Sequence, residues 1–275
     1  MIKGERLVNK KTIKWQNIYL VLMFVVLYAP IFYLMFYSFN AGGNMSGFSG
    51  FTLEHYQTLF ADTRLMTFII NTFIVAILSA LFATIIGTFG AIAIYYARQK
   101  RHRQLLLNLN NVLMVTPDVM MGASFLILFT LFIKIKMGFM TVLLAHIAFN
   151  IPIVVLMVLP RLYEMNPTMI TAAQDLGATH GQTIRNIILP SITSGIFAGF
   201  FMAFTYSLDD FAVTFFLAGN GFSTLAVEVY SRARRGISLE INALSTLMFL
   251  LALILVVGYY FIQVNEQRRK EKGAV

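Results

Sequence analysis

Apolar residues dominate long stretches of this 275-residue chain, and polar residues collect between them. Six of these stretches are long enough to cross the hydrocarbon core of a bilayer, for which a helix needs about 20 residues. They run over Ile18–Phe39, Leu65–Ala97, Leu105–Ile133, Met137–Leu159, Ser191–Leu217 and Ile237–Val264. The pattern predicts an all-α integral membrane protein with six transmembrane helices.

The first apolar stretch sets the organisation of the N-terminus. It is longer than the apolar region of a secretory signal peptide, about 7 to 15 residues, and no small-x-small cleavage site follows it. We therefore expect it to remain as a spanning helix. The resulting domains are a cytoplasmic segment over residues 1–17, a membrane domain over 18–264 and a basic cytoplasmic tail over 265–275.

Basic residues indicate how the six helices are oriented. If the N-terminus is cytoplasmic, fifteen of the 21 lysines and arginines fall in inner segments and six in outer ones. The positive-inside rule therefore predicts that both termini are cytoplasmic. Three of the outer residues run against the rule, and the sequence offers only a surface turn to explain them: Arg232, Arg234 and Arg235.

The composition excludes several classes of protein. Charged residues make up only 12% of the chain, against about 25% in soluble domains. The net charge of +9 does not indicate nucleic-acid binding, because the basic residues lie between apolar stretches and not on one soluble face. The absence of cysteine excludes disulfides, a thiol nucleophile and a thiolate metal site. We expect no catalytic residue, no cofactor and no metal.

Two local patterns predict packing and not chemistry. Thr52 can cap a short amphipathic helix in the outer loop that precedes the second span. Within that span, small residues recur at Ser79, Ala83 and Gly87, followed by Gly90. Small residues at this spacing allow helix backbones in a membrane to approach closely.

The longest inner loop, residues 166–190, reads "NPTMITAAQDLGATHGQTIRNIILP". Asn166 before Pro167 is typical of a helix start. Gly177 can end that helix by adopting a left-handed conformation. Thr179 with Gln182 forms a possible capping box for a second helix. The loop is therefore predicted to be two short helices, which in the simplest interpretation only connect the fourth and fifth spans.

The spacing within this loop resembles a known signature. Small and apolar residues match the "EAA, three residues, G, nine residues, I-x-L-P" pattern of ABC importer permeases at Ala172, Ala173, Gly177, Ile187, Leu189 and Pro190. The chain departs from the pattern at Thr171, where the signature has glutamate. Asp175, four residues later on the same helix face, is a candidate replacement for that acid.

Other stretches extend the resemblance over most of the chain. They are "YAPIFYLMFYSFN" (28–40), the second span (71–98), "MVTPDVMMG" (114–122), "LLAHIAFNIP" (143–152) and "FTYSLDDFAVTFFLAG" (204–219). Together they are similar to the spermidine/putrescine permeases of ABC importers, and within that family to the second of the two membrane subunits.

This resemblance implies a type I ABC importer permease fold in a bacterial cytoplasmic membrane. It also implies partners: a second homologous permease subunit, an ATP-binding cassette ATPase in two copies that receives the 166–190 loop, an external polyamine-binding protein, and membrane lipid. Independently, the chain has no G-x-x-x-x-G-K-[S/T] loop, so we expect ATP to be bound by another chain.

Three carboxylates lie inside the third and fifth apolar stretches, where each costs at least about 2.5 kcal/mol. Asp118 falls about 20 Å along a straight third span and Asp209 about 28 Å beyond Pro190, so both should lie near the outer side. No lysine or arginine lies in either span, which suggests a polycation as the partner of Asp118, Asp209 and Asp210. Candidate aromatic faces for such a cation are Phe204, Tyr206, Phe211 and Phe215.

Each polar residue also has a plainer interpretation. Adjacent helical positions differ by about 100°, so Asp209 and Asp210 cannot both face a passage, and one can cap or pair locally. Asp118 can cap a helix broken at Pro117. His146 and Asn150 favour interhelical hydrogen bonding. Glu240 is expected to be solvated.

Three other functions remain open at this stage. The first is an ABC permease for a different solute, because the loop signature is shared across substrates. A proton- or sodium-coupled secondary transporter is less favoured, since no inverted repeat is apparent. An intramembrane aspartyl protease would need Asp118 and Asp209 to converge, and their flanking residues do not resemble its motifs.

Overall fold

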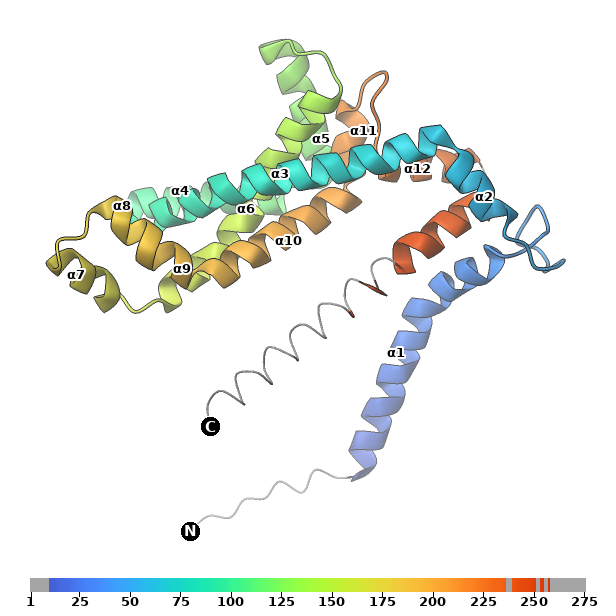
Figure 1. Cartoon of the computed structure of the whole chain (residues 1–275), viewed down its shortest axis with the longest axis horizontal. Helices are drawn as coiled ribbons and strands as arrows, with labels where there is room; N and C mark the ends of the chain where they lie inside the picture. The colour runs from blue at the N-terminus through green and yellow to red at the C-terminus, as the bar shows by residue number, and fades with distance from the viewer. Residues whose placement is uncertain (1–9, 236–238, 251–252, 255–256, 258–275) are drawn as a thin grey trace. The chain divides into compact units, whose positions relative to one another are not determined.

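The computed structural model describes residues 10–235, 239–250, 253–254 and 257, and in them the chain is helical apart from loops and one isolated bridge between Asn40 and Phe51. The chain divides into two compact units (Figure 1). The first unit is residues 1–63 with 232–275, and the second unit is residues 64–231. The predicted basic tail, the first nine residues and much of the sixth span lie outside the described residues.

The first unit contains α1 (Lys10–Tyr37), α2 (Glu54–Ala61) and an apolar helix over Leu239–Leu250. Its outer loop closes around the buried amide of Asn40, which donates to the carbonyls of Asn44 and Gly47 at 3.0 and 2.8 Å. Thr52 accepts from the backbone N–H of Glu54 at 3.1 Å, as expected of a residue that starts α2.

Arg232 has partners that the sequence alone did not suggest. Its guanidinium lies 2.7 Å from a carboxylate oxygen of Asp62 and 3.4 Å from one of Glu240. Glu240, expected to be solvated, keeps 35% of its side-chain surface exposed and in addition pairs with arginine. The pairing gives a physical reason for a basic residue on the predicted outer side.

The second unit contains most of the helical packing. In chain order it comprises α3 (Thr63–Tyr96), α4 (Lys100–Val115), α5 (Asp118–Ile127) with its π-helical extension η1 (Leu128–Ile133), α6 (Phe139–Glu164), α7 (Thr168–Asp175), α8 (His180–Thr183), η2 (Ile184–Ile188), α9 (Leu189–Ser191), α10 (Thr193–Asp209), α11 (Ala212–Leu217) and α12 (Leu225–Arg235), which ends in the first unit. α10 packs along α6, and α11 packs on α5. The α7–α8 loop lies at the opposite end of this unit from α5 and α11 (Figure 1).

Small residues allow these helices to approach closely, as predicted for α3. Val154 of α6 is fully buried between two glycines. A Cβ added at Gly87 of α3 would lie 2.7 Å from the Val154 Cβ, and one added at Gly199 of α10 would lie 3.2 Å from its Cγ1. α10 continues this contact with buried residues at every fourth position, Gly195, Gly199, Ala203 and Ser207. Gly90 is less tightly packed, because a Cβ added there would lie 3.7 Å from the nearest atom.

Two of the predicted spans are bent and not straight. The chain bends by 106° between α4 and the α5–η1 segment, and by 69° between the helices on either side of Ile192. The first bend follows from Pro117, because a residue before proline avoids the helical region, and Thr116 has ψ of 129°. The assumption of a straight third span behind the depth expected for Asp118 is therefore wrong, while Asp209 ends the continuous helix α10 and its depth remains a prediction.

Three of the described helices are long and apolar enough to cross a bilayer: Trp15–Tyr37, Thr63–Tyr96 and Phe139–Glu164. The number rises to five if each bent pair is one span. The sixth predicted span begins with the apolar Leu239–Leu250 helix and continues outside the described residues. The count of six and the cytoplasmic termini remain predictions.

The close contact at Gly87 leads to a prediction. Gly87→Ala should lower the thermal stability of the detergent-solubilised protein, because overpacking a tight contact costs about 1–3 kcal/mol. Gly90→Ala is the matched control, since it gains the same helix propensity and its Cβ meets only ordinary contacts. Survival of the monodisperse peak in size-exclusion chromatography after heating measures the difference. Equal melting temperatures for the two variants would contradict this packing.

Candidate functional site

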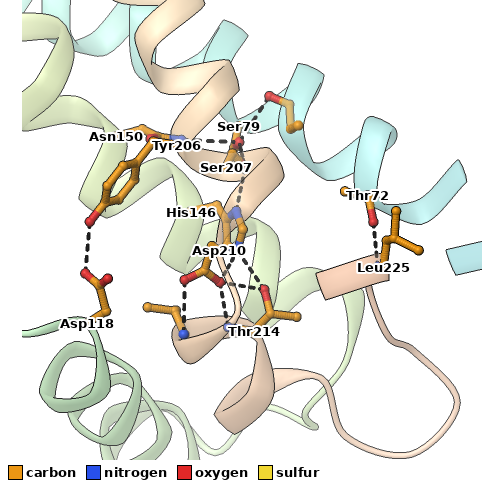
Figure 2. A network of polar contacts seen from close by, with 12 residues as sticks. Thr72, Ser79, Asp118, His146, Asn150, Tyr206, Ser207, Asp210, Thr214 and Leu225 are labelled. Atoms are coloured by element: carbon orange, nitrogen blue, oxygen red, sulfur yellow. Dashed lines mark hydrogen bonds and ion pairs between the residues drawn. The ribbon is translucent and has the colours of Figure 1, made fainter. Parts of the chain in front are cut away.

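Two residues expected to line a passage lie together at the start of α5. The Tyr206 hydroxyl of α10 donates to Oδ1 of Asp118 at 2.9 Å (Figure 2). Asp118 is exposed in this chain, and Tyr206 retains 41% of its surface. The Tyr206 ring also meets Phe149 of α6 edge-on at 5.3 Å. The pair is therefore an accessible carboxylate held by a phenol that packs on a second ring.

Asp210 has a different role from Asp118. It is 9% exposed and lies at the break between α10 and α11. Its carboxylate accepts from the backbone N–H groups of Val213 (3.1 Å) and Thr214 (2.8 Å) and from the Thr214 hydroxyl (2.8 Å). These bonds satisfy amides at the start of α11 that the helix itself cannot pair. Asp210 is thus the local cap, while Asp209, the neighbouring acid, is exposed.

His146 and Asn150 lie fully buried where α3, α6 and α10 meet. The His146 Nδ1 is 2.5 Å from the Ser207 hydroxyl, and its Nε2 is 3.0 Å from the Thr214 hydroxyl and 3.3 Å from Asp210 (Figure 2). Asn150 donates to the Ser79 hydroxyl at 3.4 Å, and that hydroxyl lies 3.0 Å from Ser207. Both residues form interhelical hydrogen bonds, as expected.

The candidate aromatic faces contact other rings. Phe204 stacks on Phe200 with ring centroids 6.3 Å apart and is half-buried against the core. Phe211 lies 4.3 Å from Tyr230 and 5.3 Å from Phe215. The structure therefore brings only Tyr206, of the four predicted aromatic residues, into contact with a predicted acid.

The predicted coupling loop forms the two capped helices expected from its sequence. Asn166 accepts from the Thr168 N–H at 3.0 Å, and Gly177 has φ of +85° after α7. The Gly177 and Ala178 N–H groups donate to Gln174 and Ala173, which is the Schellman pattern at a helix end. Thr179 and Gln182 form the capping box of α8. A leucine that sequence reasoning missed, Leu176, is 90% exposed at this turn.

The signature residues are divided between surface and core. Thr171, Ala172, Asp175 and Gly177 are exposed, and Ala173 is half-buried. The Thr171 hydroxyl donates to the Thr168 carbonyl at 3.0 Å, so it bonds its own helix. At the other end Ile187 and Leu189 are half-buried and Pro190 is exposed, with Leu189 packing on the core that surrounds the buried Ile188. An exposed first helix is thus fixed rigidly to the membrane domain.

The polar cluster also contains residues that the sequence did not single out. Ser79 was interpreted only as a small packing residue, and Ser207 and Thr214 were not selected. Ser207 follows Gly199 and Ala203 at intervals of four residues, and this spacing is the sequence pattern that could have placed it on the packed face of α10. Within the described residues, no group of three or more potential metal ligands comes together.

The cap at Asp210 leads to a stability prediction. Asp210→Ala should destabilise the protein by about 2 kcal/mol, because it removes a cap and leaves buried N–H groups unpaired. Asp209→Ala, which changes the adjacent exposed acid, should have little effect on thermal unfolding. If both variants melt like the wild type, the capping role of Asp210 is wrong.

The chain is similar to several known proteins. Residues 87–271 match the family described as "Binding-protein-dependent transport system inner membrane component". The chain is 36% identical over 251 residues to the spermidine/putrescine transport system permease protein PotC of Escherichia coli (strain K12), covering 91% of this chain and 93% of that protein. It is 32% identical over 261 residues to the putrescine transport system permease protein PotI of the same organism, with 93% of each covered.

A solved structure shows the same fold. A chain of a bacterial ABC transporter involved in the import of the acidic polysaccharide alginate superposes with a TM-score of 0.74 at 17% identity, covering 92% of this chain and 95% of that one. The family match and the identity to the permeases together establish the relationship. The protein belongs to the family of inner membrane components of binding-protein-dependent transport systems, and it is an ABC importer permease subunit.

Proposed function

We propose that this permease carries polyamines, spermidine or putrescine, and forms half of their passage through the membrane. The exposed Asp118 carboxylate, held by Tyr206 in an otherwise apolar span, is the observation that supports this proposal. Among the described residues, none of the ion pairs involves Asp118. A carboxylate retained at such a cost in a transport protein is suited to a cationic substrate.

The chemistry of the pair fits a polycation with methylene spacers. An ammonium group can pair with the Asp118 carboxylate while the adjoining methylenes and cation contact an aromatic face. Tyr206 supplies such a face next to the acid, and Phe149 supports its ring. Asp209 is a second accessible acid one residue before the break. The two permease relatives are named for spermidine and putrescine, which is the same class of cation.

The transporter would be completed by other chains. We infer that a second homologous permease provides the other half of the passage and that two ATPase copies each receive a coupling loop. In this chain the loop is α7 and α8, and its signature residues Ala172 and Gly177 present an exposed surface. An external binding protein would deliver the substrate. ATP binding would move the loop, and the rigidly attached core would change access to the passage.

An alternative solute is the strongest competing proposal. Family membership supports neither a secondary transporter nor an aspartyl protease, and Asp118 bonds to Tyr206, not to a second aspartate. The coupling loop would serve any solute equally well. The acid on the candidate passage and the likeness to the two permeases favour a cation, but neither bears on ATPase coupling, so the substrate must be tested separately.

ATP-dependent uptake of labelled spermidine in cells that carry the complete transporter tests the substrate. At equal membrane abundance, Asp118→Asn should lower uptake tenfold or more, because it removes the charge and keeps the shape. Tyr206→Phe should have a smaller effect, and Glu54→Gln, an exposed acid on α2, serves as the control. Wild-type cells that take up no polyamine would contradict the polyamine proposal and direct the search to another solute.

Recruitment of the ATPase tests the coupling loop. Gly177→Asp should abolish co-purification of the ATPase with the permease, since a φ of +85° strains any residue with a Cβ and would distort the turn. Gly181→Asp adds the same side chain four residues later, also into open space but at an ordinary φ, and should retain the ATPase. Equal recovery of the ATPase with both variants would refute the docking assignment.

A further inference from the structure

The buried polar cluster joins four helices and the break in the fifth span. Its members are Ser79 of α3, His146 and Asn150 of α6, Ser207 of α10, Asp210 at the break and Thr214 of α11 (Figure 2). Each is at most 9% exposed. Polar groups at such a depth are costly unless they are satisfied by each other. The hydrogen-bond directions within the cluster can therefore be worked out from its donors and acceptors.

The assignment begins at Asp210, which accepts from two backbone N–H groups and the Thr214 hydroxyl. Since Thr214 donates its proton to Asp210, its oxygen must accept from Nε2 of His146 at 3.0 Å. The other ring nitrogen, Nδ1, lies 2.5 Å from the Ser207 hydroxyl, and it accepts from that hydroxyl when it carries no proton. The proton on Nε2 also faces Asp210 at 3.3 Å.

The chain of hydrogen bonds continues in the same direction toward α3. Because Ser207 donates to His146, its oxygen is free to accept from the Ser79 hydroxyl at 3.0 Å. Ser79 in turn accepts from the amide nitrogen of Asn150 at 3.4 Å. The Ser79 hydroxyl also donates to the Ala76 carbonyl at 3.3 Å, so Ser79 joins α3 to the cluster whichever hydroxyl donates between Ser79 and Ser207. His146 is the residue that bonds both sides of the helix break.

His146 also lies next to the exposed pair. Its ring is 4.8 Å from Phe149, and Phe149 meets the Tyr206 ring at 5.3 Å. Tyr206 directly precedes Ser207, the residue that His146 holds through Nδ1. One ring nitrogen of His146, Nδ1, therefore bonds α10 at Ser207, and the other, Nε2, bonds α11 at Thr214. The Asp118 to Tyr206 hydrogen bond depends on where α10 is held.

We propose that His146 is a positioning residue of the translocation passage. With Nε2 bonded to Thr214 and Nδ1 bonded to Ser207, it fixes the break between α10 and α11 and so keeps Tyr206 aligned on Asp118. This inference rests on the proposed function for its effect on transport. His146 itself does not touch substrate, because it is fully buried behind Phe149 and Ser207.

Two amide substitutions separate the two sides of the imidazole. In His146→Gln the amide nitrogen reaches about as far as Nε2 and can still donate to Thr214 and Asp210. In His146→Asn the amide oxygen replaces Nδ1 as the acceptor for Ser207, but the donor on the Asp210 side is lost. His146→Gln, which loses the bond to Ser207 on α10, should raise the KM for spermidine uptake about fivefold, whereas His146→Asn, which keeps that bond, should remain within twofold of the wild type.

A double substitution distinguishes positioning from a general loss of structure. In a Tyr206→Phe background, His146→Gln should raise KM no further, because the bond that His146 positions is already absent. An independent effect of the same size in both backgrounds would overturn the proposal. Equal KM values for the Asn and Gln variants would also overturn it. A loss of uptake that is fully explained by lower abundance of the variant in the membrane would do the same.

A second readout does not require polyamine transport. The chain contains no cysteine, so Asp118→Cys with Tyr206→Cys introduces the only two thiols of this subunit. A short bifunctional methanethiosulfonate should cross-link them within the complete transporter, as detected by mass spectrometry of this chain. Adding His146→Gln should lower the yield severalfold, and adding His146→Asn should not. Equal yields would refute positioning, whereas absent polyamine uptake by the wild type would refute only the proposed substrate.

Discussion

The cost of a polar group in an apolar surrounding is the constraint on which this structure depends. The second unit contains an interrupted helix, a buried carboxylate and a buried imidazole within predicted spans. Most of these groups are bonded to one another: Asp210 caps α11, and His146 binds Ser207 and Thr214. Asn150 donates to Ser79, while its Oδ1 has no hydrogen-bond partner among the described residues. The break in the fifth span is therefore a built feature, with its free amides accounted for.

Close packing around α6 makes this cluster possible. Val154 fits between Gly87 and Gly199, so α3 and α10 approach α6 closely enough for hydroxyls and the imidazole to bond across the helices. The same contact continues through Gly195 of α10 toward the coupling loop. Candidate passage and coupling loop thus lie at opposite ends of one packed unit (Figure 1). A displacement of the loop can reach the passage through rigid helices.

Local patterns in the sequence predicted local structure well. Proline, glycine and capping residues act over a few positions, so the helix ends at Gly177 and Thr179 and the packing at Gly87 could be read directly. The bend at Pro117 was underestimated because apolar residues on both sides suggested one straight span. The sequence indicates that either Asp209 or Asp210 caps locally. Which of the two does so depends on the residue at which α10 ends, and no short pattern specifies that residue. The Asp118 to Tyr206 bond joins residues 88 positions apart, a distance that no short pattern specifies.

Dependence of transport on the positive charge of the solute tests the central claim most directly. The measurement is ATP-dependent uptake by the complete transporter in proteoliposomes, comparing labelled spermidine with its fully acetylated form, which keeps the methylene spacers and loses the charges. The account predicts uptake of spermidine and none of the acetylated compound. Equal uptake of both, or uptake of neither, would contradict a passage built around an accessible carboxylate for polyamines.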